Sequence, residues 1–246
     1  MGKGKLKKFS EVEGFSNVIQ PVIESYTEVS FHLKGNWNKQ FFNNNNPVIL
    51  ELGCGKGEYT VGLARQYKAY NFIGVDIKGA RIWKGAKMAL ENQITNAAFL
   101  RTRIDLIPYF FEKEEVSEIW ITFPDPQPKK QNKRLTSAQF LKLYQKIMLN
   151  NGVIHLKTDN SDLHNYTLRL LEANNIVPTA VTDNLYNSNL VSDILNIKTF
   201  YESQFLAKNK PITYLQFQLP TDALINEIEK YTYEKTGYVI NRNLNV

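Results

Sequence analysis

The sequence predicts an α/β protein with a doubly wound sheet of about seven strands and helices on both faces. From residue 47 onward, short apolar runs alternate with helical patterns, as in parallel strands joined by crossover helices. A glycine-rich turn follows the first apolar run and opens a helix. The length of 246 residues suits one large domain or one domain with an appendage.

The expected elements follow from these runs and from the residues that bound them. Strands are expected at residues 48–52, 71–75, 99–102, 118–123, 153–158, 177–182 and 213–219. Helices are expected at residues 58–66, 80–91, 137–149, 162–173 and 222–235. Ser137 is suited to begin the third helix as its N-cap, and Asn151-Gly152 to follow its end. An amphipathic stretch at 194–205 lies in the long connection between the last two strands.

The first 46 residues differ from the rest, and we interpret them as a basic N-terminal arm with a helical extension. Four lysines, Lys3, Lys5, Lys7 and Lys8, stand before the first acidic residue. The segment ends in Asn43–Asn46, and consecutive asparagines favour a loop. The main domain is therefore expected to span residues 47–246.

Composition narrows the classes of function. The hydrophobic fraction of 43% and the charged fraction of 22% are those of a globular protein. Thirty Lys and Arg against 24 Asp and Glu give a net charge of +6, which favours polyanionic partners. The single cysteine excludes an internal disulfide, and the three histidines show no metal-ligand spacing. With no apolar run of 18 residues and no signal-like N-terminus, we expect a soluble cytoplasmic protein without a metal ion.

The turn after the first strand reads Glu51-Leu52-Gly53-Cys54-Gly55-Lys56-Gly57. The alternative without a ligand is a tight turn between a strand and a helix, but a tight turn does not need three glycines at alternate positions. A P-loop requires Ser or Thr after the lysine, and a dinucleotide fingerprint requires G-x-G-x-x-G; neither is present. S-adenosylmethionine carries an ammonium group in place of a pyrophosphate, and the carboxylate of Glu51 suits that cation. We therefore expect Glu51, Gly53, Gly55 and Gly57 to bind this cofactor.

Asp76 ends the second predicted strand, 25 residues after Glu51. A carboxylate at this place can accept hydrogen bonds from both hydroxyls of a ribose, as in other doubly wound nucleoside sites. The alternative is an Asp that caps the following helix. The combination of Glu51 and Asp76 resembles the Rossmann-like methyltransferases.

A second informative segment follows the fourth predicted strand, Pro124-Asp125-Pro126-Gln127-Pro128 and then a basic stretch. Three prolines stiffen this loop, and Lys129, Lys130, Lys133 and Arg134 follow it. The alternative to a phosphate-binding role is a solvated basic loop.

Together these motifs resemble the bacterial tRNA (guanine-N7)-methyltransferases, which methylate guanine 46 in the variable loop. The matching residues are Pro124-Asp125-Pro126, Lys129, Lys133-Arg134, His155-Leu156-Lys157-Thr158-Asp159-Asn160 and Thr199-Phe200-Tyr201-Glu202. The basic loop is about two residues shorter than the family pattern, and Gln131-Asn132 replaces its histidine region.

The resemblance implies the remaining site residues. Asp125 is implied as the catalytic residue and as a cofactor ligand, and Arg103 lies where the family often has an acid beside the adenine, with Asp105 as a possible substitute. Substrate binding is implied for Lys129, Lys133, Arg134, Asp159, Thr199, Tyr201 and Glu202. For Asp159-Asn160 the alternative is a helix cap, for Glu202 a solvated charge, and for the aromatic residues 200, 201 and 205 core packing is preferred to base stacking.

The expected activity is methyl transfer from S-adenosylmethionine to N7 of guanine in tRNA, with tRNA as the partner and no obligate protein partner or membrane. Two other functions stay open. One is a non-catalytic tRNA-binding module on the same fold, and the other is a methyltransferase for small molecules or proteins, against which the basic loop and arm argue.

Overall fold

The computed structural model of the chain describes residues 3–21 and 31–229. Its strands are β1 (Val18–Ile19), β2 (Val48–Leu52), β3 (Asn71–Asp76), β4 (Ala97–Arg101), β5 (Val116–Thr122), β6 (Met148–Thr158), β7 (Pro178–Thr182) and β8 (Thr213–Leu219). Its α-helices are α1 (Lys3–Glu13), α2 (Glu58–Gln66), α3 (Gly79–Glu91), α4 (Ala138–Tyr144), α5 (Ser161–Ala173) and α6 (Phe200–Leu206). Short helical turns cover Trp37–Phe42, Ile104–Tyr109, Gln131–Lys133 and Leu185–Asn187.

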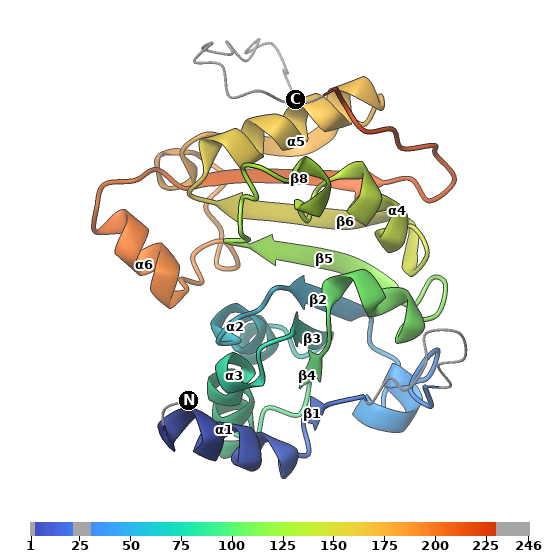
Figure 1. The fold of residues 1–246 in the computed structure, drawn as a ribbon, viewed down its shortest axis with the longest axis vertical. Coiled ribbons are helices and arrows are strands. Elements are labelled where there is room, and N and C mark those ends of the chain that lie inside the picture. Colours follow the sequence, from blue (N-terminus) through green and yellow to red (C-terminus); the bar gives the residue numbers. More distant parts are fainter. Residues whose placement is uncertain (1–2, 22–30, 230–246) are drawn as a thin grey trace.

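The strands form one sheet in the order β1-β4-β3-β2-β5-β6-β8-β7 (Figure 1). In the part of the sheet that runs β1-β4-β3-β2-β5-β6, all neighbouring strands are parallel. Strand β8 pairs antiparallel with both β6 and β7. Every residue of β2 is buried, as a continuous apolar run predicts for the centre of a parallel sheet. Parallel pairing brings the carboxyl ends of β2, β3, β4, β5 and β6 to one edge, and the residues that follow these strands therefore meet there.

Helices cover both faces of the sheet. Along β5, Ile119 and Ile121 belong to the core beneath α4 and α5, whereas Trp120 belongs to the core beneath α2 and α3. This alternation is the period of two that places successive strand residues on opposite faces. The predicted doubly wound architecture is thus confirmed.

The sheet has an eighth strand that the sequence did not indicate. Val18 and Ile19 pair in parallel with Phe99 and Leu100 of β4, and Phe99 N–H donates to the Asn17 carbonyl over 2.8 Å. Part of the segment expected to be an arm therefore extends the sheet edge, and Figure 1 shows α1 lying beside α3. Two residues carry too little periodicity to predict a strand.

The helix expected at 137–149 ends at Tyr144. The carbonyl of Ile147 accepts a hydrogen bond from Val116 N–H over 3.0 Å, and Met148 pairs with Val116. Strand pairing with β5 thus takes the backbone groups that another helical turn would need.

The helix expected at 222–235 is wrong for its described part, because residues 222–229 are not helical. Side chains from elsewhere take the backbone groups of this segment: Gln145 Nε2 donates to the Ala223 carbonyl over 2.8 Å, and Asn226 N–H donates to Asn174 Oδ1 over 2.7 Å. Residues 230–235 lie outside the described residues. Of the amphipathic stretch at 194–205, only the part from Phe200 onward is helical.

The glycine-rich turn packs directly against α3. Gly57 has a φ of +68°, and a Cβ there would lie 2.5 Å from the Phe99 ring. A Cβ on Gly85 of α3 would lie 2.7 Å from the Lys56 carbonyl oxygen and 2.8 Å from Gly57 Cα. Gly57 needs glycine because of its positive φ and the Phe99 ring, and Gly85 needs glycine because the backbone of the turn lies against its Cα.

We therefore expect Gly85→Ala to lower the free energy of unfolding by about 1–3 kcal/mol, although alanine has the higher helix propensity. The matched control is Gly14→Ala, whose Cβ would have no neighbour nearer than 3.6 Å and whose effect should stay within about 0.5 kcal/mol. Urea denaturation measures both changes. Equal stability of Gly85→Ala and the wild-type protein would contradict the close approach of turn and helix.

Candidate cofactor and nucleic-acid site

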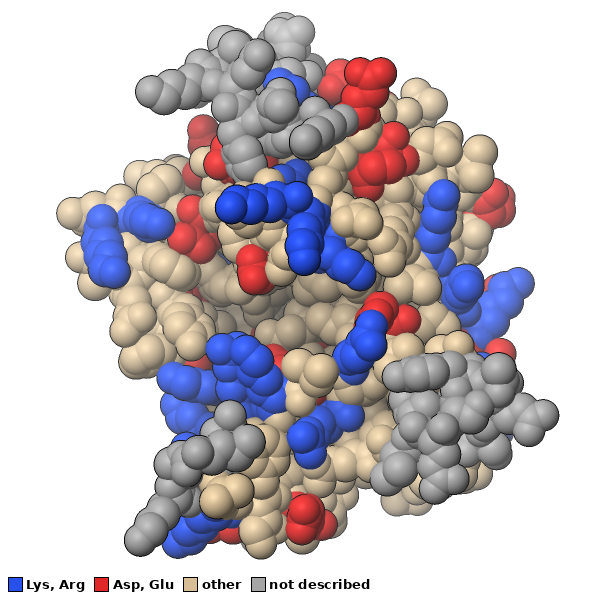
Figure 2. Space-filling view, in the orientation of Figure 1, with Lys and Arg blue, Asp and Glu red and all other residues tan. Residues whose placement is uncertain are grey.

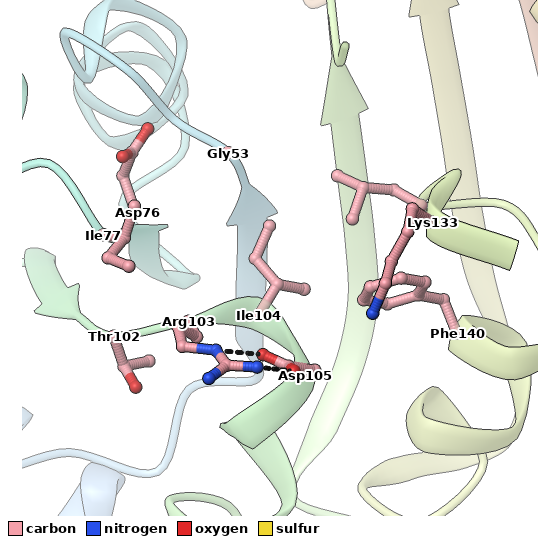
Figure 3. Close-up of a pocket in the computed structure, with 10 residues that line it drawn as sticks. Gly53, Asp76, Ile77, Thr102, Arg103, Ile104, Asp105, Lys133 and Phe140 are labelled. Carbon is pink, nitrogen blue, oxygen red and sulfur yellow. Dashed lines mark hydrogen bonds and ion pairs between the residues drawn. The ribbon is translucent and has the colours of Figure 1, made fainter. Parts of the chain in front are cut away.

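The carboxyl edge of the sheet carries a cavity of about 330 Å³ (Figure 3). Asp76 and Lys133 lie on opposite sides of it, and an ion pair between Arg103 and Asp105 lies between them at one end. The complete lining is Gly53, Asp76, Ile77, Thr102, Arg103, Ile104, Asp105, Lys133, Leu135 and Phe140. Residues from four loops thus enclose one space with apolar walls and a few charged groups.

A smaller cavity of about 70 Å³ shares Gly53 with the larger one. It lies over the glycine-rich turn, and its lining joins that turn to β5 and α6: Glu51, Gly53, Cys54, Gly55, Lys56, Glu58, Arg81, Thr122, Phe123, Thr199 and Tyr201. The two cavities thus meet at Gly53 of the turn.

Four backbone N–H groups of the turn donate hydrogen bonds inside the protein. Gly53 and Cys54 donate to the Val75 carbonyl over 2.8 and 3.1 Å, and Gly57 donates to the Cys54 carbonyl over 2.8 Å. Gly55 N–H donates to Asp76 Oδ2 over 3.0 Å. A phosphate-binding turn needs such groups to point at the anion, so these four N–H groups are not available to a pyrophosphate.

Asp76 is buried at the end of β3, with 8% of its surface exposed. Its Oδ1 accepts from Lys78 N–H over 2.8 Å and its Oδ2 from Gly55 N–H, which holds the carboxylate against the glycine-rich turn at the side of the larger cavity. Each oxygen keeps a second acceptor site, so a ribose diol can still bind. Asp76 therefore holds the turn and lines the cavity, whereas the alternative role as a side-chain cap is wrong, because α3 begins after Lys78 without a side-chain cap.

Glu51 lies beneath the smaller cavity and is 3% exposed. It accepts hydrogen bonds from Thr60 N–H over 2.8 Å, from the Thr60 hydroxyl, and from the Thr122 hydroxyl over 2.6 Å. Burial raises the pKa of Glu51 from 4.5 to about 7; the hydrogen bonds from Thr122 and Thr60 oppose this, and the charge of Asp76 adds to it. A cation bound above it would favour the charged carboxylate.

These observations fit S-adenosylmethionine. The apolar walls suit an adenine, and Asp76 suits a ribose. The two carboxylates, Glu51 and Asp76, suit a cationic rather than an anionic tail. Cys54 is buried, and burial raises the pKa of its thiol well above the ordinary value, so the side chain is unsuited to act as a nucleophile.

Arg103 lines the larger cavity as an exposed residue, and its Nε donates to Asp105 Oδ1 over 3.0 Å. Both residues that sequence analysis considered for the adenine are therefore at the cavity. Thr102, Ile104, Leu135 and Phe140 complete the wall, and the sequence did not identify them because they are ordinary core-type residues brought together by folding.

Asp125 is exposed in the loop after β5 and accepts Gln127 N–H over 3.0 Å. It lines neither cavity, although its neighbours Thr122 and Phe123 line the smaller one. Lys129 and Lys130 are exposed in the same loop, whereas Lys133 reaches the larger cavity. Figure 2 shows Lys and Arg side chains gathered on both sides of a central hollow, over this loop and over α3.

The prediction that Arg134 binds a phosphate of the substrate is wrong. Its side chain is 1% exposed, its Nε donates to the Pro126 carbonyl over 3.2 Å, and its guanidinium lies 4.2 Å from the centre of the Tyr166 ring. A buried guanidinium cannot reach a phosphate on the surface. Arg134 instead holds the loop that carries Asp125.

Glu202 is also buried, with no exposed surface, and is neither a guanine ligand nor a solvated charge. It forms an ion pair with Lys157 at 2.8 Å and accepts from the Tyr186 hydroxyl over 2.6 Å. Burial lowers the pKa of Lys157, and Glu202 opposes this. The pair holds the start of α6 on β6, and removing one partner of such a buried pair costs about 3–5 kcal/mol.

Thr199 and Glu202 form a capping box at the start of α6. The Thr199 hydroxyl accepts from Glu202 N–H over 3.1 Å, and Glu202 Oε2 accepts from Thr199 N–H over 3.3 Å. The spacing Thr-x-x-Glu is a known sequence signature of a helix start, and it could have identified this role.

Phe200 and Tyr201 differ from the expected core packing, since they are 46% and 43% exposed. Lys56 Nζ lies 3.7 Å from the centre of the Phe200 ring, and Phe200 N–H donates to Glu58 Oε2 over 2.7 Å. Burial alone raises the pKa of Glu58, but hydrogen bonds from Lys84 and from Phe200 N–H outweigh it and lower the pKa. The start of α6 is therefore fixed to the glycine-rich turn. Only Phe205 packs as expected, against Phe123.

Asp159 is 18% exposed and lies 3.3 Å from Lys210 Nζ. The cap of α5 is Asn160, whose side chain accepts Leu163 N–H over 2.8 Å.

Within residues 3–21 and 31–229, no cluster of metal ligands is present and no helix is long and apolar enough to cross a bilayer.

The fold and the site define a class I S-adenosylmethionine-dependent methyltransferase. The family described as "Putative methyltransferase" matches residues 45–215. Among solved structures, the 16S rRNA methyltransferase KamB is similar with a TM-score of 0.58 and 13% identity, covering 83% of this chain and 99% of that one. The 30S ribosomal A1408 methyltransferase from an uncultured bacterium has a TM-score of 0.56 and 19% identity, with 80% and 97% coverage. These two show the fold.

Closer relatives define the family. The tRNA (guanine-N(7)-)-methyltransferase of Bacteroides fragilis (strain YCH46) is 49% identical over 92% of this chain and 90% of its own length. That of Christiangramia forsetii is 52% identical over 88% of this chain and 98% of its own. The chain belongs to the tRNA (guanine-N7)-methyltransferase family.

The raised pKa of Glu51 predicts how stability depends on pH. The unfolded carboxyl titrates near 4.5 and the folded one near 7, so between these values the folded state binds more protons. The contribution of Glu51 to stability is complete below pH 4.5 and is lost as pH rises through about 7, by about 3 kcal/mol.

Glu51→Gln keeps the shape and removes this titration, so its free energy of unfolding should vary less between about pH 5 and 8 than that of the wild-type protein. Glu91→Gln is the control, because Glu91 is an exposed residue on α3 and should leave the wild-type slope unchanged. Denaturant titrations at several pH values measure it. Parallel curves for wild type and Glu51→Gln would show that Glu51 is charged throughout.

Proposed function

We propose that this protein transfers the methyl group of S-adenosylmethionine to N7 of guanine 46 in the variable loop of tRNA. The observation that carries the proposal is the joint position of the two cavities, the Asp125 loop and its lysines at one edge of the sheet. The names of the relatives supply the nucleobase and the RNA class. We further propose that it acts in the cytoplasm and needs no obligate protein partner.

Methyl transfer to guanine N7 requires alignment of the reactants and a negative charge near the purine, and it requires no general base. Bound S-adenosylmethionine supplies an electrophilic methyl group on a positively charged sulfur. Guanine N7 carries an in-plane lone pair and no proton, so alignment supplies most of the rate. Positive charge moves onto the purine, and a carboxylate beside it stabilises that change. We assign this role to Asp125, whose loop is stiffened by three prolines and held by Arg134.

The cofactor is assigned to the two cavities. Asp76 would hold the ribose, and the walls formed by Ile77, Thr102 and Ile104 would enclose the adenine. Glu51, through the glycine-rich turn, supplies negative charge below the methionine ammonium.

The guanine is assigned to the surface between Tyr201 and the Asp125 loop. Tyr201 is exposed and lines the smaller cavity, so its ring can pack against a base. Asp159 would accept hydrogen bonds from guanine N1–H and N2–H₂, after Lys210 leaves its carboxylate. Lys129 and Lys133 would hold the flanking phosphates.

The direct test is mass spectrometry of nucleosides from tRNA incubated with the protein and S-adenosylmethionine. We expect 7-methylguanosine from a tRNA transcript with guanine at position 46 and none when adenine replaces it. Tight tRNA binding without any methylated nucleoside would favour the non-catalytic module, and methylation at another atom would overturn the assignment to N7.

Asp125→Asn should lower turnover by about 10²-fold or more, the scale of losing one preorganised electrostatic contact. The wild-type rate should stay flat from about pH 7 to 9, because no base is deprotonated. Asp193→Asn is the control, since Asp193 is exposed and lines neither cavity. Single-turnover rates at saturating cofactor and tRNA measure both. A near-normal rate for Asp125→Asn would move the chemistry to another residue.

A further inference from the structure

We infer that a third cavity, between α1 and the start of α3, binds one nucleotide of the RNA chain near the methylated guanine. The cavity has a volume of about 520 Å³, and its lining is Phe9, Ile77, Lys78, Ala80 and Arg81. This volume lies in the range of ordinary ligand pockets. The inference rests on the proposed function, because it takes the substrate to be RNA.

The lining combines an aromatic ring, an exposed apolar side chain and two cations. Ile77 is 54% exposed, and Phe9 is half-buried. Lys78 and Arg81 are exposed, and no ion pair of either one is found among the described residues. None of the five described lining residues is acidic. Apolar packing for a base beside cations for its phosphate is how single-stranded nucleic acid is bound without sequence readout.

The cavity adjoins both parts of the candidate site. Ile77 also lines the 330 Å³ cavity, and Arg81 also lines the 70 Å³ cavity beside Tyr201. A strand that places guanine against Tyr201 therefore passes Arg81 before it reaches this cavity. Figure 2 shows Lys and Arg side chains gathered over α3, on the side of the hollow opposite to the Asp125 loop.

The helix that completes the cavity is fixed to the rest of the protein. Trp83 Nε1 on α3 donates to Glu11 Oε2 on α1 over 2.6 Å, and Lys8 Nζ lies 4.6 Å from the centre of the Trp83 ring. Val12 has no exposed surface. The α1 wall is therefore present before RNA binds, which lowers the entropy cost of binding.

The Phe9 ring is fixed as well. The Arg101 guanidinium lies 5.0 Å from its centre, and Arg101 Nη1 donates to Gln20 Oε1 over 2.8 Å. A Cβ on Gly79 would lie 3.2 Å from Phe9 Cε1, so the ring packs closely on the first turn of α3. A ring held from two sides offers the base a rigid wall.

The test uses the full-length protein and a tRNA transcript, with filter binding between about 50 and 200 mM salt. Phe9→Leu keeps an apolar side chain and removes the ring, and we expect about a fivefold to tenfold loss of affinity with an unchanged salt slope. Phe9→Tyr should bind like the wild-type protein. Lys78→Gln should make the logarithmic salt slope shallower by about one unit, as expected for one lost phosphate contact.

Matched controls lie at the opposite edge of the sheet, directly before β3. Tyr70→Leu removes an aromatic ring that is 38% exposed, and Lys68→Gln removes an exposed cation. Both should leave tRNA affinity and the salt slope unchanged. Calorimetry with S-adenosylhomocysteine should give equal affinities for all variants, because none of the substituted side chains binds the cofactor.

Wild-type affinity for Phe9→Leu together with a wild-type slope for Lys78→Gln would overturn the inference. Thermal unfolding shows whether Phe9→Leu alters the packing of α1. If it does, the salt slope of Lys78→Gln alone tests the inference, because Lys78 is exposed and its substitution leaves the packing unchanged. Binding does not depend on turnover. A protein that binds tRNA through this cavity and forms no 7-methylguanosine would contradict the proposed activity alone, and one that methylates tRNA without using the cavity would contradict this inference alone.

Discussion

The buried carboxylate of Glu51 is the interaction on which the site depends. It joins the end of β2 to Thr60 on α2 and to Thr122 at the end of β5, and so fixes both sides of the glycine-rich turn. The arrangement places an acid, whose pKa burial raises to about 7, directly below the smaller cavity. Burying a carboxyl in this way is costly unless its oxygens are hydrogen-bonded, and Thr60 and Thr122 meet that need.

A second buried contact fixes the start of α6, which is the segment proposed to face the substrate. The ion pair of Lys157 and Glu202 holds the start of α6 on the sheet, while Glu58 accepts the Phe200 N–H from the opposite side. Phe200 and Tyr201 are thereby exposed on a backbone that is held at both ends. The glycine-rich turn and the residues Phe200 and Tyr201 belong to one packed unit, although about 140 residues separate them in sequence. Such preorganisation is what a reaction dominated by alignment requires.

Residues at the ends of strands can be located from the sequence, whereas roles that depend on burial cannot. Asp76, Arg103 and Asp125 follow apolar runs, and the structure places Asp76 at the end of β3 and the other two after β4 and β5, at the carboxyl edge of the sheet. Arg134 and Glu202 belong to the same motifs, yet both side chains are buried and hold the loops that carry other residues. A motif records which residue type is present, and it does not record whether the side chain turns inward.

The sequence by itself determined the alternation of strands and helices, the glycine-rich turn and the acids beside it, because these depend on local periodicity and on backbone freedom. Only the tertiary structure decided the pairing of β1 with β4, the early end of α4 and the irregular path of residues 222–229. It also decided the exposure of Phe200 and Tyr201 and the cavity against α1. In each case a contact between residues far apart in sequence outweighs the local preference, and no local pattern contains that contact.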